Sequence, residues 1–155
     1  MKGSQKVLQA LNQLLALELA AVNQYFVHAK MCENWGYERL AGHFRATSLE
    51  EMKDAEEIIQ RILFLEGMPA MAQLPVIAGA GVAEQLRADL ETETRAIKLL
   101  HDGIAASLED GDQASREFFA SRLPEEEGHA DWLETQLALI DQIGESNYLA
   151  QQIRG

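Results

Sequence analysis

The sequence predicts an all-α protein: a four-helix bundle with one long crossover and a short fifth helix at the C-terminus. Ala, Leu, Glu and Gln dominate, and only three prolines occur in 155 residues, which favours helix. Four long stretches repeat apolar residues at steps of three and four, which places each set on one face of a helix. A segment with prolines and glycines separates the second stretch from the third, so one connection is expected to be long.

The first helix is predicted from about Lys6 to Asn34, where Trp35-Gly36 closes it. The second helix follows directly, from about Tyr37 to Glu66, and Gly67-Met68-Pro69 stops it. Because the connection between these two helices is short, we expect them to lie antiparallel.

The crossover, Gly67–Gly81, contains Pro69, Pro75 and Gly79 and is predicted to be loop. A thirty-residue helix measures about 45 Å, whereas fifteen extended residues span about 50 Å. The crossover is therefore long enough to run along the whole bundle, which leaves the second and third helices parallel.

The third helix is predicted over Val82–Glu109 and is ended by Asp110-Gly111. The fourth is predicted over Asp112–Ile143 and is ended by Gly144. A short fifth helix is expected over Ser146–Ile153. The short turn between the third and fourth helices makes them antiparallel as well.

Pro124 falls in the middle of the fourth helix. A proline there removes the hydrogen bond to the Ala120 carbonyl, so we expect a kink. Ser121 offers a second N-cap, and a division of the helix into two segments is the alternative.

Composition and charge narrow the class of protein. The length suits one domain, residues 1–155, with a real core. A net charge of −12 argues against nucleic acid as a partner, and no long apolar run predicts a membrane span. The N-terminus shows no signal-peptide pattern, so the cytoplasm is the expected location. The single cysteine, Cys32, excludes an intrachain disulfide and a Cys-x-x-Cys metal site.

Each of the four apolar stripes contains a glutamate at a position where an apolar residue is expected. These residues are Glu18, Glu51, Glu93 and Glu126, one on each predicted helix. A carboxylate inside a bundle costs several kcal/mol unless it is compensated, and four together repel one another. Shared cations remove this cost, so the stripes predict a metal site in the bundle core.

Two of the glutamates have a second candidate ligand three residues further on, Asp54 after Glu51 and His129 after Glu126. Di-iron proteins of the ferritin-like type carry a lone Glu on two helices and Glu-x-x-His on the other two. One half of this chain matches that pattern, and the other half has Asp54 where a histidine belongs. Carboxylates bridge two hard cations, and imidazole supplies a neutral terminal ligand.

Over its whole length the chain resembles the bacterioferritins, which are ferritin-like proteins. The resemblance rests on the following stretches: Met1-Lys2-Gly3, Asn23-Gln24-Tyr25-Phe26, Glu51-Met52-Lys53, Arg61-Ile62-Leu63-Phe64-Leu65-Glu66-Gly67, Glu126-Glu127-Gly128-His129, Asp131-Trp132-Leu133-Glu134 and Asn147-Tyr148-Leu149.

The resemblance implies a hollow shell of twenty-four chains that stores ferric mineral. It implies that Fe²⁺ is oxidised, by O₂ or H₂O₂, at a di-iron centre within each subunit. It also implies haem b on a twofold axis, held by one methionine from each of two subunits, and an electron donor of the ferredoxin type.

Carried over by position, the resemblance implies that Glu18 and Glu93 are terminal iron ligands, Glu51 and Glu126 bridging ligands, and His129 the imidazole ligand. Met52 becomes the haem ligand. It lies one residue after Glu51, about 100° around the helix, so it faces away from the core. From its position alone, packing against a neighbour is the better explanation of Met52, and the resemblance is what favours the haem role.

Asp54 leaves two outcomes open. If it coordinates iron, the site holds five carboxylates, and two Fe²⁺ leave it with one net negative charge, which favours ferric iron and slows reductive release. If it turns away, one iron is weakly held and oxidation is impaired. Ala46 and Glu50 occupy positions where the family often has a histidine and an acid that form an inner-surface iron site.

Two functions therefore compete. The first is an active ferroxidase and iron-storage subunit. The second is a haem-carrying structural subunit that assembles with an active sister chain, which the altered positions at Asp54 and Ala46 favour. A di-iron oxygenase or a rubrerythrin-like peroxidase is disfavoured, because the rubredoxin cysteines are missing and the sequence indicates no substrate cavity. We expect Tyr25 to pack with its hydroxyl on a ligand carboxylate, and His28, His43 and His101 to be structural or exposed.

Overall fold

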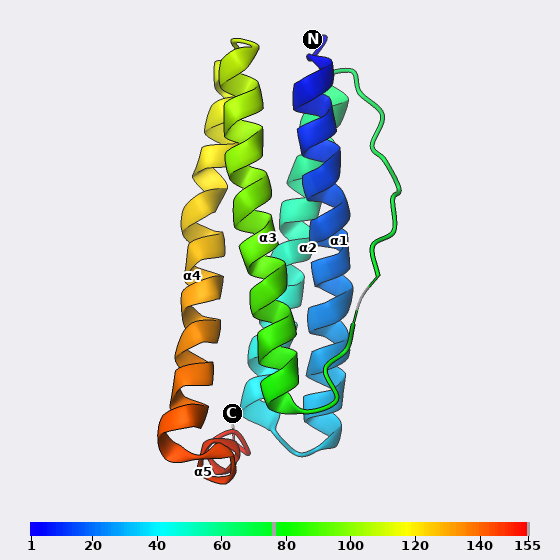
Figure 1. Cartoon of the computed structure of the whole chain (residues 1–155). Coiled ribbons are helices and arrows are strands. Elements are labelled where there is room, and N and C mark those ends of the chain that lie inside the picture. The colour runs from blue at the N-terminus through cyan, green and yellow to red at the C-terminus, as the bar shows by residue number, and fades with distance from the viewer. Residues whose placement is uncertain (76, 155) are drawn as a thin grey trace.

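The computed structural model describes residues 1–75 and 77–154 and contains, in this part, helices but no strands. The elements are α1 (Gln5–Asn34), α2 (Glu38–Phe64), α3 (Val82–Glu109), α4 (Gln113–Ile143) and α5 (Glu145–Ala150). The first four form a bundle, with α5 at one end (Figure 1). Within the described ranges, no helix combines the length and the apolar character needed to cross a bilayer.

The predicted all-α, ferritin-like bundle is confirmed, and the predicted ends of α1 to α4 fall within two residues of those observed. The fifth helix is shorter than predicted, because it ends at Ala150 and does not continue to Ile153. Val76 in the predicted crossover and Gly155 at the end of the predicted domain lie outside the described residues.

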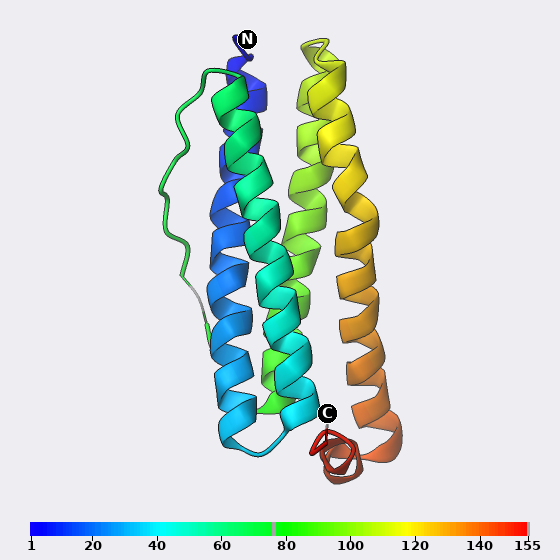
Figure 2. The same cartoon turned by 180° about the vertical axis from the view of Figure 1, so that it is seen from behind.

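The topology follows from two tight turns and one long connection. Gly36 and Gly111 sit at the turns with φ of +87° and +69°, a region that glycine occupies without strain. These turns make α1–α2 and α3–α4 antiparallel hairpins. The crossover runs along the outer side of α1 in both views, so α2 and α3 are parallel (Figures 1 and 2).

The fourth helix is not divided at Pro124, contrary to the alternative of two segments. Ser121 does not act as an N-cap, since its hydroxyl donates a hydrogen bond to the Phe118 carbonyl at 2.9 Å. Pro124 and Ala120 are both exposed, so the carbonyl that proline deprives of a partner faces solvent. Water can satisfy that carbonyl, which explains why the helix continues.

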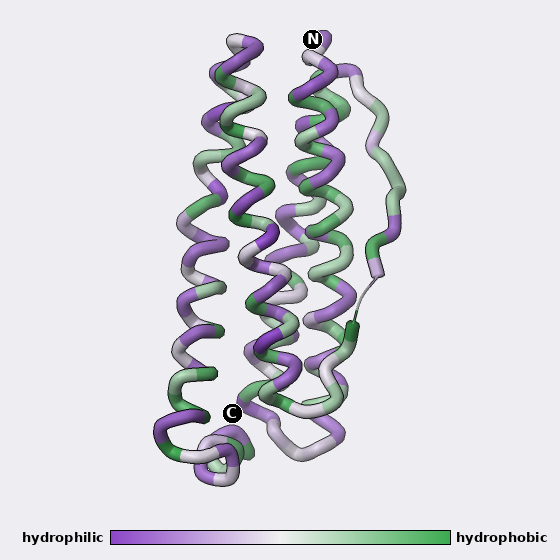
Figure 3. Tube along the Cα trace, viewed as in Figure 1, coloured by the Kyte–Doolittle hydropathy of each residue, from purple (hydrophilic) through white to green (hydrophobic). Residues whose placement is uncertain are grey.

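Two apolar clusters form the core, one toward each end of the bundle. The first cluster contains Leu11, Leu14, Leu15, Ile58, Ile62, Leu100 and Phe119 among others. The second contains Tyr25, Cys32, Leu40, Phe44, Leu86, Leu133 and Tyr148 among others. Apolar and polar residues alternate with the turns of each helix, as amphipathic helices require (Figure 3). Between the two clusters lies a layer of the bundle whose buried residues belong to neither cluster.

One side of the bundle is joined by polar side chains. The closest backbone contacts join α1 with α2, α3 with α4, and α1 with α3. Between α2 and α4, Arg122 forms an ion pair with Glu57, and Arg61 donates to the Ser115 hydroxyl at 3.1 Å. We call this α2–α4 boundary the polar seam; both helices lie on the near side in Figure 2.

Gly103 of α3 lies close against α4 in the core. A Cβ at this position would lie 2.6 Å from the Cδ1 and Cε1 atoms of the fully buried Phe119 ring. We predict that Gly103→Ala lowers the free energy of unfolding by up to about 2 kcal/mol. Overpacking costs about 1–3 kcal/mol, and this exceeds the roughly 1 kcal/mol gained in helix propensity. Thermal unfolding of both proteins measures the difference.

Gly42→Ala is the matched control, because Gly42 also lies inside a long helix but has open space where the Cβ would go. It should stabilise the protein by up to about 1 kcal/mol. An equal effect of the two substitutions would contradict the packing argument.

Candidate metal centre

Four buried glutamates occupy the layer between the two apolar clusters. Glu18, Glu51, Glu93 and Glu126 come one from each of α1 to α4, and none is more than 3% exposed. Each continues the buried face of its own helix, so helix formation and apolar packing alone direct all four inward. The four glutamates therefore meet at one level of the bundle.

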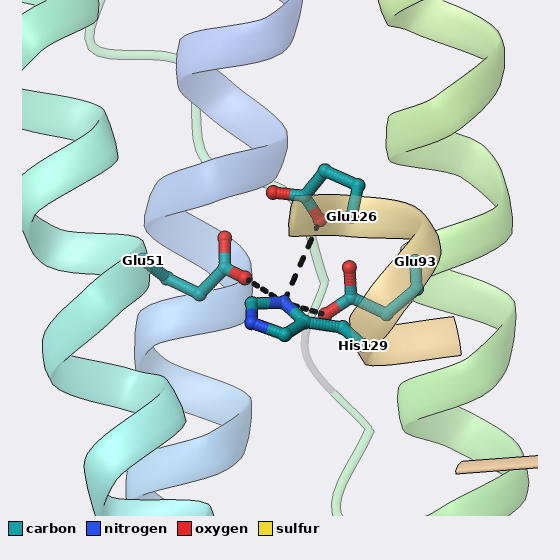
Figure 4. Close-up of side chains that lie close together, drawn as sticks. All are labelled: Glu51, Glu93, Glu126 and His129. Carbon is teal, nitrogen blue, oxygen red and sulfur yellow. Dashed lines mark ion pairs between the residues drawn. The ribbon is translucent and has the colours of Figure 1, made fainter. Parts of the chain in front are cut away.

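The predicted ligands form two overlapping groups, each able to bring four ligand atoms within 4.8 Å of one another. The His129 group consists of Glu51, Glu93, Glu126 and His129, and these side chains converge in Figure 4. The Asp54 group consists of Glu18, Glu51, Asp54 and Glu126. Glu51 and Glu126 belong to both groups. All six predicted ligands are thus brought together, and Asp54 is not turned away from the others.

Each of the six side chains has a buried atom without a hydrogen-bond partner. These atoms are Glu18 Oε2, Glu51 Oε1, Asp54 Oδ2, Glu93 Oε2, Glu126 Oε2 and His129 Nδ1. A buried polar atom without a partner is rare and costs about 1–3 kcal/mol. Two of these atoms, Glu51 Oε1 and His129 Nδ1, lie 3.0 Å apart as an ion pair. The others are explained together if cations complete the site, and carboxylates with an imidazole are the donor set expected for iron.

The imidazole of His129 is oriented from both sides. Its Nδ1 atom lies 3.0 Å from Glu51 Oε1, 3.5 Å from Glu93 Oε1 and 3.9 Å from Glu126 Oε2. Its Nε2 atom lies 2.9 Å from Glu50 Oε2, across the polar seam. With the Nε2 proton donated to Glu50, Nδ1 faces the glutamate layer. Nδ1 carries a proton in the metal-free chain and presents a lone pair once a metal ion displaces that proton. A carboxylate behind the ring is the usual way in which proteins orient a histidine ligand.

The electrostatics of the layer favour bound protons when no cation is present. Burial, together with the neighbouring carboxylates of Glu93 and Glu51, raises the pKa of Glu126 to about 12. Burial also raises the pKa of Glu18 well above its usual value, with Glu51 as the next cause. The pKa of Asp54 is raised to about 8 by burial and by the neighbouring Glu125 carboxylate.

His129 has the opposite balance of effects. Burial by itself lowers the pKa of the imidazole, but the carboxylates of Glu51 and Glu93 outweigh burial and raise it to about 12. Protons on the carboxylates and on this ring substitute for positive charge in the layer. A divalent ion that enters must displace them, so metal affinity increases with pH.

Tyr25 contacts the layer as expected. Its hydroxyl donates to Glu93 Oε1 at 2.6 Å, and its ring is buried in the second apolar cluster. This hydrogen bond fixes Oε1 of Glu93, while Oε2 is buried without a hydrogen-bond partner.

A buried polar network beside the layer was not predicted. His28 Nδ1 pairs with Asp89 at 3.0 Å, and the amide of Gly79 donates to His28 Nε2 at 3.1 Å. Gln24 donates to Asp89 at 2.8 Å. The network ties the end of the crossover to α1 and α3, which gives His28 the structural role expected for it. Asp89 lies four residues before Glu93 on the buried face of α3. That spacing was the feature of the sequence that could have identified Asp89 as buried.

The other two histidines also lie outside the layer. His43 stacks on Trp132 with 3.5 Å between ring centroids, and burial lowers the pKa of His43. His101 is exposed on α3. Both agree with the expectation of structural or exposed roles.

Met52 follows Glu51 on α2, about 100° around the helix from the glutamate layer, and 52% of its surface is exposed. It lines a hollow of about 570 Å³ between α1, α2 and the crossover. The hollow is mostly apolar and is lined by Ala16, Leu19, Ala20, Val22, Asn23, Met52, Met71, Ala72, Gln73 and Leu74. A methionine thioether beside an apolar hollow suits a flat apolar ligand that carries a soft metal ion.

Comparisons with known proteins agree with the fold. Residues 8–143 match the family described as Ferritin, with a ferritin-like domain. The chain is 44% identical to a bacterioferritin of Mycobacterium bovis over 152 residues, 97% of this chain and 96% of the relative. It is 44% identical to bacterioferritins of Rhodobacter capsulatus, with 96% and 92% covered, and of Streptomyces coelicolor, with 99% and 92% covered.

Because the layer holds protons, we predict that the stability of the metal-free chain falls as pH rises. Glu126 and Asp54 keep protons in the folded state at pH values where the unfolded chain has released them, and His129 does so above about pH 6.5. The folded state then binds more protons, so stability falls as pH rises, by up to about 1.4 kcal/mol per pH unit for each proton. The thermal midpoint of chelated protein should be higher at pH 5.5 than at pH 7.5.

Adding a divalent metal should raise the midpoint more at pH 7.5 than at pH 5.5, because fewer protons compete. Glu126→Gln removes one of the shifted groups and should flatten the dependence in the chelated protein. A midpoint that rises with pH in chelated native protein would refute this account of the layer.

Proposed function

The chain belongs to the ferritin-like domain family, and to the bacterioferritins within it, and from this membership we propose that it stores iron and oxidises Fe²⁺. The observation that carries the proposal is the pair of ligand groups that share Glu51 and Glu126. Two cations that share two carboxylates form a dinuclear centre, and two Fe²⁺ ions held there can each give one electron to the same oxidant molecule.

We assign roles to the six residues on this basis. Glu51 and Glu126 bridge the two ions, because both belong to both groups. Glu18 and Asp54 complete one position, and Glu93 and His129 complete the other. The unpaired buried atoms on all six side chains support this assignment. Glu50 holds His129, and Tyr25 holds Glu93, so these two act through the ligands.

The oxidation balances with either oxidant. Two Fe²⁺ give two electrons to O₂, which takes up two protons and leaves as H₂O₂. With H₂O₂ as the oxidant, two Fe²⁺ give it two electrons, and with two protons it yields two molecules of water. The protein's part is to hold two Fe²⁺ side by side and to stabilise the product charge, because anionic oxygen ligands favour Fe³⁺ over Fe²⁺. The ferric product is then stored as mineral.

We also propose that haem b binds at Met52. The hollow beside Met52 is apolar and reaches from α1 to the crossover, which fits the flat macrocycle. The exposure of Met52 leaves its sulfur free for a partner ion. A thioether from each of two subunits supplies soft ligands, and these favour ferrous haem. Bound haem would supply electron transfer to stored ferric iron.

The proposed assembly is a shell of twenty-four chains in the cytoplasm. Helices α1 and α2 expose large apolar residues, including Leu19, Phe26 and Leu49, and Leu19 lines the same hollow as Met52. Such a surface is typical of subunit interfaces. A ferredoxin-type protein is the proposed electron donor. The net negative charge of the chain attracts Fe²⁺ and repels nucleic acid, so nucleic acid is not a proposed partner.

A second function is favoured by the surroundings of Asp54. At neutral pH its raised pKa, which burial and Glu125 cause, means that a metal must displace a proton from this carboxyl. Weak metal binding at that position would make the chain a haem-carrying structural subunit that assembles with a catalytically active sister. The first function is preferred because Asp54 faces Glu18, Glu51 and Glu126 directly.

Stopped-flow measurement of Fe²⁺ oxidation distinguishes the two functions. We predict that the protein made of this chain alone oxidises two Fe²⁺ per subunit in a fast phase, well above the rate in buffer. Glu126→Gln should abolish the fast phase, because it replaces a shared charged ligand with a neutral amide of the same size. The expected loss is at least about tenfold in rate.

Glu127→Gln is the control, since the neighbouring residue is exposed and lies outside both ligand groups. It should leave the fast phase unchanged. If native protein is no faster than buffer, the first function is wrong and the structural role is retained.

Haem binding is tested by substituting its proposed ligand. We predict that Met52→Leu abolishes the absorption spectrum of bis-thioether haem, because leucine keeps the apolar volume but offers no sulfur. Shell assembly, measured by size-exclusion chromatography, should be unchanged. Absorption spectra of both proteins reconstituted with haem give the comparison.

Met68→Leu serves as the control, because Met68 is highly exposed in the crossover and does not line the hollow. It should bind haem as the native protein does. A normal haem spectrum in the Met52 variant would show that another residue is the ligand.

A further inference from the structure

The two metal positions of the proposed centre have different ligand chemistry. Beyond the shared Glu51 and Glu126, one position has Glu93 and the imidazole of His129, and the other has Glu18 and Asp54. The position completed by His129 therefore has one nitrogen ligand. The position completed by Asp54 has only carboxylate oxygens.

Both sets of side chains are committed to the interior. Asp54 is 7% exposed and Glu18 is 3% exposed, and each has a buried oxygen without a hydrogen-bond partner. His129 presents Nδ1 to the layer while Nε2 is held by Glu50. The two positions therefore differ in ligand chemistry inside the core, where water has little access to replace the protein ligands.

Ligand type governs which cation each position prefers. Carboxylate oxygens suit hard cations such as Mn²⁺ and Fe³⁺, whereas imidazole adds affinity for borderline ions such as Zn²⁺, Co²⁺ and Fe²⁺. We propose that the centre is chemically unequal: the Asp54 position selects hard cations, and the His129 position selects borderline divalent cations. This inference rests on the proposed dinuclear centre and specifies which ions each half takes.

The charge of the ligands also favours hard cations at the Asp54 position. The Asp54 group consists of four carboxylates, and no imidazole is among its ligands. Together the two positions have five carboxylates, so two divalent ions leave one negative charge uncompensated. A hard ion of higher charge neutralises it. The Asp54 position is therefore the one in which a trivalent ion is held most strongly.

The order of metal affinities determines how this is tested. Zn²⁺ binds most protein sites more tightly than Mn²⁺, so excess Zn²⁺ would fill both positions whatever their preference. With one equivalent of Zn²⁺ per chain and an excess of Mn²⁺, the ions instead distribute by relative preference. Zn²⁺ should then occupy the position with the imidazole.

The experiment uses crystals of the assembled protein grown under these conditions, with anomalous maps recorded at the zinc and manganese edges. We expect zinc at the His129 position with at least about tenfold higher occupancy than at the Asp54 position. Manganese should show the reverse distribution. In solution, electron paramagnetic resonance should detect about one bound Mn²⁺ per chain after the equivalent of Zn²⁺ has been added.

Asp54→His is the matched variant, because it gives both positions one imidazole and leaves the other ligands in place. Zinc should then divide about equally between the two positions. Zinc divided equally in the native protein, or concentrated at the Asp54 position, overturns the inference but leaves a dinuclear centre. Absence of bound metal at both positions in native crystals overturns the proposed function, and the inference with it.

Discussion

The structure depends on one constraint: a layer of acidic side chains is buried between two apolar clusters. Apolar packing on both sides forces Glu18, Glu51, Glu93 and Glu126 into the interior, because a helix cannot turn one residue outward without exposing its neighbours. The mutual repulsion of the carboxylates is then unavoidable in the metal-free chain. Protons relieve it partly, and cations that bridge the carboxylates relieve it without leaving unpaired oxygens.

The four helices contribute differently to this layer. The α1 and α3 helices pack closely and supply rigid support, including the hydrogen bond from Tyr25 to Glu93 and the buried pair of His28 with Asp89. The α2 and α4 helices meet across the polar seam, where the ion pair of His129 with Glu50 lies. Long polar side chains span this boundary, so it leaves room for ions that close apolar packing would exclude. The side of the bundle with the weaker backbone contact is thus the side that carries both two-residue ligand motifs.

The sequence predicted more of the fold than of the contacts. Helix periodicity and the Gly-Pro segment were sufficient for the bundle and the crossover, because these signals are local. The possible division of α4 at Pro124 was wrong. The effect of a proline inside a helix depends on whether water can bond to the carbonyl four residues earlier, and the sequence alone does not show this. The four glutamates were identified because they interrupt apolar stripes. Asp89 was missed because its partners, His28 and Gly79, come from distant parts of the chain, and the tie between Glu50 and His129 was missed for the same reason.

Sharing Glu51 and Glu126 has a thermodynamic consequence for the proposed ions. Two sites built from common side chains are not independent, because the first occupant changes the charge, the proton content and the freedom of the groups that the second must use. The coupling free energy is reciprocal, so each ion alters the affinity for its neighbour by the same factor. A saturation isotherm of this centre is therefore a property of the pair and cannot be separated into one constant for each half.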